Sequence, residues 1–278
     1  MSTRGGVDST TRNNDPAGNG HAARSMIIAT RTSSLLLLAV PSLRRGLRMD
    51  AEQLAVDRSM RVSKHTRGME WAPSPSPSVW RKRVALEGPL ESGRVTSLVR
   101  YDADSEFKEH GHPDGEEILV LEGSWQDANG DHPAGTYMLN PEGFRHAPSS
   151  KDGCVLWVKL RQHGGPSREH IRLDTKRMEW QEVDTQGVKI KTLYSHPEHV
   201  ESMRIEKWEA GAKMERECPQ MTEFLVLNGE AHDASRETFE QWSWLRVPAG
   251  STVSLTSTVG CEVFVKEGEW LPNTTEAS

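Results

Sequence analysis

The chain has 278 residues, a formal net charge of -6 and 35% hydrophobic side chains. This acidic balance offers no basic stripe for a nucleic acid, and no apolar run reaches the roughly 20 residues that a bilayer-spanning helix needs. Only three cysteines occur, without a CxxC pair, which argues against a disulfide framework and indicates a reducing compartment. We therefore expect a cytoplasmic protein with neither a nucleic acid nor a membrane as partner.

The N-terminal part of the chain differs from the rest. Residues 1–23 are rich in Gly, Asn, Ser, Thr and Asp without periodicity, which predicts disorder. Between Pro16 and Met49 there is no acidic residue, and arginines flank a short apolar run. That pattern also fits a targeting segment. The sequence therefore predicts a disordered leader over residues 1–68, with organelle targeting by residues 1–48 as the alternative.

From about Met69 onward, short segments rich in β-branched and aromatic residues are separated by turn signals. The proline-rich stretch at residues 72–78 predicts an extended lead on the surface rather than a strand. Strands are predicted over residues 81–86, 94–101, 117–121, 136–139 and 154–160. Many short strands with tight turns and little helix predict an all-β sandwich or barrel.

A histidine cluster follows the second of these strands. His110 and His112 lie two residues apart and would project from the same face of a strand, with Glu116 close behind. His146 must arrive from another strand. Imidazole and carboxylate donors suit zinc, iron, manganese, nickel or copper better than calcium or magnesium. Glu117 is the competing carboxylate, but alternation along the strand favours the opposite face for it.

The sequence therefore predicts one metal site, formed by His110, His112, Glu116 and His146. It would hold one divalent transition metal per chain. Zinc and iron are the first candidates, with manganese and nickel as alternatives.

An internal repeat with offsets of 109, 106 and 107 residues predicts two similar modules. The matching segments are Met69-Glu70-Trp71 with Met178-Glu179-Trp180, LVLEG at Leu119 with LVLNG at Leu225, and Gly153-Cys154 with Gly260-Cys261. The predicted domains are residues 69–165 and residues 166–278.

The two histidine segments resemble the two-part signature of the cupins. The first part matches at His110, His112, Glu116 and Gly123, with Asp104 in place of the leading glycine, and the second part matches at Gly135, Pro141, Gly143 and His146. GEEILVLEG and the residues around both motifs are similar to the ChrR-like cupins, whose name comes from a zinc-dependent anti-sigma factor. This resemblance implies two tandem jelly-roll barrels, also called double-stranded β-helices.

The same resemblance implies two classes of function, and the residues do not decide between them. One is an oxygen-using, dioxygenase-like enzyme that acts on a small organic substrate. The other is a non-enzymatic, zinc-binding sensory or structural module. Both would bind a small-molecule ligand or a metal, and a homodimer is compatible with either.

The second repeat lacks the predicted ligands. Val253 stands where His146 stands in the first repeat, and Glu217, Cys218 and Pro219 fall where the two histidines would be. Cys218 with Glu223 offers too few ligands, so we expect a degenerate cupin without metal. Its apolar strands would cover the first barrel or a second subunit. A small-molecule pocket lined by Trp242 or Trp244 is the alternative.

The remaining candidates have less specific interpretations. Phe107, Trp125, Tyr137 and Trp157 would either line a cavity at the metal site or belong to the barrel core. The histidines without ligand spacing are expected to be solvated loop residues: His132, His163, His170, His196, His199 and His232. Cys154 and Cys261, at matching positions in apolar strands, are expected in the core.

Overall fold

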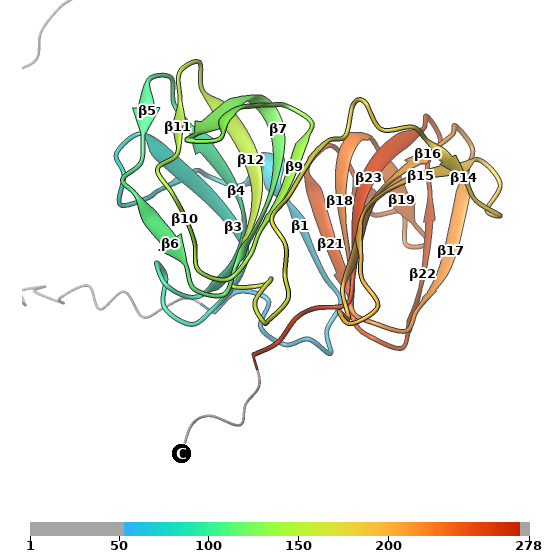
Figure 1. Ribbon diagram of the computed structural model, residues 1–278. Coiled ribbons are helices and arrows are strands. Elements are labelled where there is room, and N and C mark those ends of the chain that lie inside the picture. Colours follow the sequence, from blue (N-terminus) through green and yellow to red (C-terminus); the bar gives the residue numbers. More distant parts are fainter. Residues whose placement is uncertain (1–52, 273–278) are drawn as a thin grey trace, which may run out of the picture. The chain divides into compact units, whose positions relative to one another are not determined.

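The computed structural model describes residues 53–272, which form two β-barrels side by side (Figure 1). Apart from one 3-10 turn, η1 (Thr66–Gly68), the regular elements of these residues are strands. No helix in this part of the chain could cross a membrane. The prediction of an all-β chain with two tandem barrels is confirmed. The expectations for residues 1–52 lie outside the described residues.

The first barrel is formed by one large sheet, in the order β13-β9-β7-β12-β4-β3-β2, and by the small sheet β10-β6. Its strands from the first repeat are β2 (Ala72–Pro73), β3 (Val79–Glu87), β4 (Arg94–Tyr101), β5 (Ser105–Glu106), β6 (His110–His112), β7 (Glu116–Asp127), β8 (Gly130–Pro133), β9 (Thr136–Asn140), β10 (Phe144–His146), β11 (Ser149–Ser150) and β12 (Cys154–Leu160). All five strands predicted for this repeat are present. The proline-rich stretch adds the two-residue strand β2, which pairs with β3.

The second barrel repeats this plan with the sheets β1-β21-β18-β23-β16-β15-β14 and β17-β22-β19-β20. Its strands from the second repeat are β14 (Gln181–Glu182), β15 (Val188–Ser195), β16 (Ser202–Trp208), β17 (Lys213–Cys218), β18 (Thr222–Gly229), β19 (Ala231–Asp233), β20 (Thr238–Phe239), β21 (Ser243–Val247), β22 (Ser251–Thr256) and β23 (Cys261–Glu267).

Each repeat gives its leading strand to the barrel of the other repeat. β1 (Val62–His65) precedes the first barrel in sequence but pairs antiparallel with β21 of the second. β13 (Ile171–Asp174) pairs in the same way with β9 of the first. Both therefore cover sheet edges that would otherwise be open. Ordered structure thus begins before the predicted boundary at Met69, because β1 belongs to a sheet formed almost two hundred residues later.

An apolar core lies between the barrels. Leu98, Leu119 and Trp157 of the first repeat form one buried cluster with Leu225 and Phe264 of the second. Removing this much apolar surface from water stabilises the pairing of the two barrels. The expectation that the second repeat covers the first with apolar strands is confirmed.

Two buried ion pairs cross the same interface in a reciprocal arrangement. Lys159 Nζ of the first repeat lies 2.7 Å from Glu223 Oε2 of the second, and Lys266 Nζ of the second lies 2.6 Å from Glu117 Oε2 of the first. All four side chains are almost fully buried. The repeats are thus related by an approximate two-fold rotation that holds even for individual contacts.

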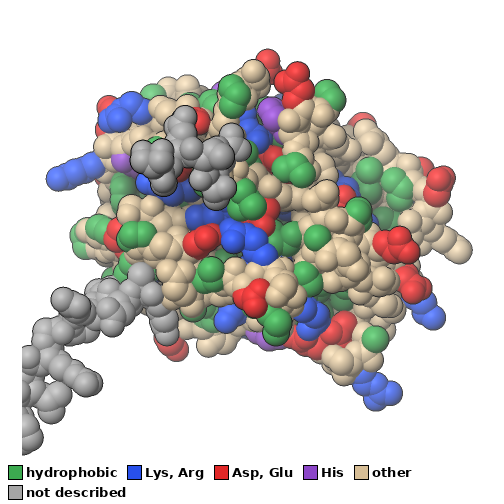
Figure 2. All heavy atoms as spheres, turned by 90° about the horizontal axis from the view of Figure 1, so that it is seen from below, with side chains coloured by type: hydrophobic (Ala, Val, Ile, Leu, Met, Phe, Trp, Pro, Cys, Tyr) green, Lys and Arg blue, Asp and Glu red, His purple; other side chains and the backbone are tan. Residues whose placement is uncertain are grey.

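The surface seen from below carries both charge signs. Figure 2 shows Lys and Arg side chains lying among Asp and Glu side chains on this face, rather than in separate blocks. Ion pairs between the described residues include Arg58 with Glu87 at 2.7 Å and Arg94 with Glu269 at 2.7 Å.

Candidate metal centre and its cavity

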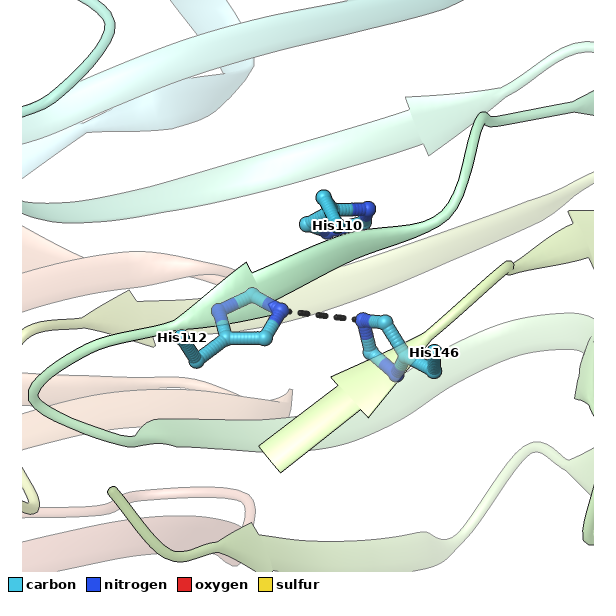
Figure 3. Close-up of side chains that lie close together, drawn as sticks. All are labelled: His110, His112 and His146. Carbon is cyan, nitrogen blue, oxygen red and sulfur yellow. Dashed lines mark hydrogen bonds between the residues drawn. The ribbon is translucent and has the colours of Figure 1, made fainter. Parts of the chain in front are cut away.

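The small sheet of the first barrel brings the three predicted histidines together. β6 and β10 pair antiparallel with His110 opposite His146 and His112 opposite Phe144. Because alternate residues share a face, His110 and His112 project to the same side of β6. Figure 3 shows both beside His146 from the neighbouring strand.

The spacing of the donor atoms fits a metal ion. One nitrogen from each of His110, His112 and His146 lies within 4.8 Å of the others, the one such cluster found in residues 53–272. Nε2 of His112 is 3.0 Å from Nε2 of His146. Two nitrogens bound at right angles, each about 2.1 Å from one ion, would be about 3.0 Å apart. The three imidazoles are therefore suited to a transition metal.

Glu116 lies beside this cluster. Its Oε2 is 3.4 Å from His112 Nε2 and 3.7 Å from His146 Nε2, and it accepts a hydrogen bond from Asn140 Nδ2 at 2.9 Å. The turn before it depends on Gly115, whose φ is +71° and where a Cβ would lie 2.4 Å from the His163 carbonyl oxygen. Sequence reasoning missed Asn140, although it lies inside the second motif, directly before Pro141.

Glu117 faces the opposite way, as the alternation along β7 predicts. It accepts a hydrogen bond from the Tyr137 hydroxyl at 3.1 Å and pairs with Lys266 in the interface between the barrels. Glu116 is therefore the carboxylate on the histidine side of the strand.

A hydrogen bond orients one of the three histidines. Nδ1 of His110 donates to the Lys108 carbonyl oxygen at 2.9 Å, and in the neutral imidazole this tautomer presents Nε2 to a metal. Nδ1 of His146 is buried and finds no partner among the described residues.

Burial controls protonation at the cluster. It lowers the pKa of His112 to about 3, with the charges of His110 and Arg161 acting in the same direction. It also lowers the pKa of His146 to about 4 against the opposing effect of Glu116. Burial raises the pKa of Glu116. At neutral pH both buried imidazoles are therefore uncharged, so their contact with Glu116 is no ion pair, and they are ready to bind a metal.

A cavity of about 340 Å³ opens beside the histidines. Its walls are mostly apolar side chains of the large sheet, including Val99, Ile118 and Leu156. Of the four aromatic residues considered above, Phe107 and Trp125 line the cavity. The other two, Tyr137 and Trp157, belong to the core between the barrels.

Charged side chains on the cavity wall are already paired. Arg81 Nη1 lies 2.6 Å from Glu91 Oε2, and Arg161 Nη1 lies 2.6 Å from Asp114 Oδ2. Apart from these ion pairs, the cavity is lined mainly by the histidine cluster and by apolar side chains.

The second barrel has other residues at the equivalent positions. β17 and β22 repeat the pairing of β6 and β10, so Arg216 and Cys218 take the places of His110 and His112. The expected alignment, with Glu217, Cys218 and Pro219 at the histidine pair, is therefore wrong in register. Thr222 replaces Glu116 and Val253 replaces His146. Glu223 corresponds to Glu117 and pairs with Lys159.

Side chains fill the interior of this second barrel. Arg216 Nη2 and Arg204 Nε each lie 2.6 Å from Oε1 of the buried Glu206. Burial alone would raise the pKa of Glu206, but Arg216 and Arg204 lower it. The remaining apolar void measures only about 10 Å³. Trp244 belongs to the core between the barrels, where its Nε1 donates to Glu223 at 2.8 Å, and the void that it lines measures only about 30 Å³.

Two other histidines differ from the expectation of solvated loop residues. His132 is buried 2.8 Å from Asp127 Oδ1, and His163 is buried beside Arg168 and Glu201. Sequence spacing gives no signal for either, because tertiary contacts decide their burial. Cys154 and Cys261 are buried free cysteines, as predicted.

Residues 59–164 and 168–271 each match the sequence model of the ChrR cupin-like domain. The chain belongs to this family. Its first cupin carries the histidine cluster, and its second cupin carries Arg216, Cys218, Thr222 and Val253 in its place. A search of curated proteins finds no match.

Solved structures with the same fold accompany this family assignment. A candidate dioxygenase from Nostoc punctiforme superposes with a TM-score of 0.65 at 16% identity, over 78% of this chain and 86% of that one. A nickel(II) complex of a bacterial pirin from Escherichia coli superposes with a TM-score of 0.54 at 14% identity, over 76% of this chain and 100% of that one. The formate complex of Lactobacillus farciminis oxalate decarboxylase superposes with a TM-score of 0.54 at 10% identity, over 75% of this chain and 86% of that one. At these identities the likeness shows the fold alone.

Proposed function

We propose that the first cupin is a metal-dependent, dioxygenase-like catalytic centre for a small oxygenated organic molecule. The observation that carries this proposal is the 340 Å³ cavity, which opens directly onto His110, His112, His146 and Glu116. A purely structural metal site is usually closed by four protein ligands, whereas a catalytic site keeps room for a substrate. The candidate dioxygenase and the nickel-bound pirin give precedents on this fold.

The residues of the site have distinct roles in this proposal. The three histidines would hold the ion, and Glu116 would be either a fourth ligand or a base. Asn140 holds the Glu116 carboxylate in place through its 2.9 Å hydrogen bond. The apolar walls exclude water and so strengthen the electrostatic interactions inside. A divalent transition metal supplies a Lewis acid there, and iron also supplies a redox centre for dioxygen.

Elemental mass spectrometry of purified protein tests the metal site. Wild type should contain about one transition metal per chain, and His110→Ala with His146→Ala should remove it because two of three imidazoles are lost. The matched control is Cys218→Ser, which changes the position equivalent to His112 in the second cupin and should keep the metal. Loss of metal in this control, or its retention in the double variant, would overturn the proposal.

Oxygen uptake then separates the two functional classes. Iron-loaded protein supplied with an aromatic ketone or a diketone should consume oxygen if the site is an oxygenase. Tightly bound zinc without turnover of these substrates would instead favour the alternative, a zinc-binding sensory or structural module.

A further inference from the structure

Two arginines in the wall of the first barrel share a single carboxylate. Arg81 and Arg83 lie two residues apart on β3 and therefore project to the same face. Arg81 Nη1 is 2.6 Å from Glu91 Oε2, and Arg83 Nη2 is 2.9 Å from Glu91 Oε1. Glu91 is the one carboxylate that either arginine contacts in residues 53–272. The three side chains together therefore carry one positive charge in excess.

Arg81 is the arginine of this group that lines the cavity. Arg81 and Glu91 both border the same 340 Å³ space as the histidines. Burial raises the pKa of Tyr101, another residue of the cavity wall, and the charge of Arg81 acts against this effect. An arginine has five N–H donors, so the contact of Nη1 with Glu91 leaves donors for a second carboxylate.

Burial makes the excess charge unfavourable without a further anion. The Arg81 side chain is only 17% exposed and that of Arg83 only 8%, whereas Glu91 is 41% exposed. Burial lowers the pKa of Arg83, the charge of Arg81 lowers it further, and only Glu91 opposes them. Because buried charges are normally paired, an anion that enters the cavity beside Arg81 would be stabilised there.

The second cupin shows a barrel interior whose charges balance. Ile190 and Thr192 stand there at the positions of Arg81 and Arg83. Two arginines meet two carboxylates inside that barrel: Arg204, Arg216, Glu206 and Glu267. The apolar void that remains measures only about 10 Å³. The excess charge thus occurs in the cupin that has the histidines and the large cavity, where a ligand can supply the second carboxylate.

We propose that Arg81 is a specificity-determining residue that binds the carboxylate of a small organic acid, while an oxygen-bearing group elsewhere in this acid faces the histidine cluster. The inference rests on the proposed function and deepens it, because it names the class of the substrate. The cavity reaches both Arg81 and the histidines, and apolar residues such as Val99 and Leu156 lie in its wall. The acid should therefore have an apolar middle part.

Two matched probes test this assignment in the zinc-loaded protein. The monohydroxamate of succinate has a metal-binding hydroxamate at one end and a carboxylate at the other, joined by a flexible two-carbon chain. In the second probe a neutral carboxamide replaces the carboxylate. Calorimetry should show that wild type binds the acid about tenfold or more tightly than the amide, as expected for a hydrogen bond between charged groups.

Two variants should change this preference in opposite directions. Arg81→Ile introduces the residue of the equivalent position in the second cupin and leaves Arg83 paired with Glu91, so the two probes should bind within about twofold of each other. Glu91→Gln leaves both arginines without a carboxylate, so the preference for the acid should increase about threefold or more. A purely structural role of Arg81 would instead alter the binding of both probes alike.

The outcomes separate this inference from the proposed function. If zinc binds but wild type does not prefer the acid, or Arg81→Ile keeps the preference, the inference is wrong and the metal centre stands. An unchanged or weaker preference in Glu91→Gln, or zinc-loaded wild type that does not bind the acid, also overturns the inference. If wild type holds no stoichiometric metal, the proposed function fails first and the inference with it.

Discussion

Two adjacent glutamates show how strongly position on a strand determines the role of a residue. Glu116 reaches the histidines, while Glu117 reaches across the interface to Lys266. One carboxylate thus belongs to the candidate metal site, and the carboxylate of the next residue belongs to the interface between the barrels.

Glu116→Gln and Glu117→Gln should therefore affect different properties, the first metal binding and the second stability. Glu116→Gln should weaken metal binding about tenfold or more if the carboxylate supports the site. Glu117→Gln should keep the metal but lower the free energy of unfolding by about 3 kcal/mol, because Lys266 is left buried without its partner. Metal titration and urea unfolding of both variants check this. Equal metal affinity in the two would contradict the assignment of Glu116.

Glu201 gives a pH-dependent prediction. Burial alone would raise its pKa, but hydrogen bonds from His163 and Arg168 and the charge of Lys266 lower it to about 2. Since this is below the ordinary value of 4.5, the folded state holds the charged form more strongly than the unfolded state. The contribution of Glu201 to stability is complete above pH 4.5 and is lost as the pH falls through about 2.

Glu201→Gln should thus lower the free energy of unfolding by about 3 kcal/mol at pH 7, since Arg168 loses its buried carboxylate. The difference in free energy of unfolding between wild type and variant should narrow below pH 4.5, where Glu201 becomes protonated in the unfolded wild-type chain. Urea unfolding at pH 7, 5, 4 and 3 measures it. A gap that stays constant down to pH 3 would contradict this explanation.

At the scale of single residues, the sequence predicts those side-chain directions that depend only on local spacing. The two-residue period of a strand predicted the shared face of His110 and His112 and the opposite direction of Glu117. It could not predict that Asn140 holds Glu116, because that contact joins two strands. The burial of His132 and His163 likewise depends on residues distant in sequence.

At the scale of elements, the exchanged strands β1 and β13 are the main feature that sequence reasoning missed. Apolar alternation predicts a strand but not the sheet that it joins, and both strands pair with the more distant barrel. The register of the second repeat was misjudged for a related reason. The pairing of β17 with β22 determines it, and the sequence contains no histidine there to mark the position.

A shortened chain tests the role of β1. A chain of residues 69–272 lacks this strand, so the edge of β21 becomes open and Lys82 loses the Thr66 carbonyl oxygen that it contacts at 2.8 Å. We expect its free energy of unfolding to fall by about 3 kcal/mol relative to residues 53–272. Urea unfolding and sedimentation should show a less stable, self-associating chain. Equal stability of the two would mean that β1 is dispensable.

At the scale of the whole molecule, the two cupins form one folding unit. The repeat and its signature predicted two barrels, but the boundary at residue 165 separates strands that complete each other. Residues 53–165 without the rest of the chain would lack β13 and leave Glu117 and Lys159 without their charged partners.

Separate chains of residues 53–165 and 166–272 should therefore be insoluble or unfolded when produced alone. Produced together they should form a one-to-one complex, because the apolar core between the barrels and both Lys–Glu pairs can form between chains. Size-exclusion chromatography and circular dichroism measure this. A folded, monomeric first half would show that the barrels are independent.

The approximate two-fold relation between the repeats does not hold for one ion pair in the interface, and this affects which repeats can pair with each other. Arg94 of β4 pairs with Glu269 of the second repeat, but the equivalents of these residues are Glu201 and Gln162. Two first repeats would place Arg94 against Gln162, and two second repeats would place Glu269 against Glu201. A pair of identical repeats would thus lack the Arg94–Glu269 ion pair, so this position favours association of each repeat with its sister over association with a copy of itself.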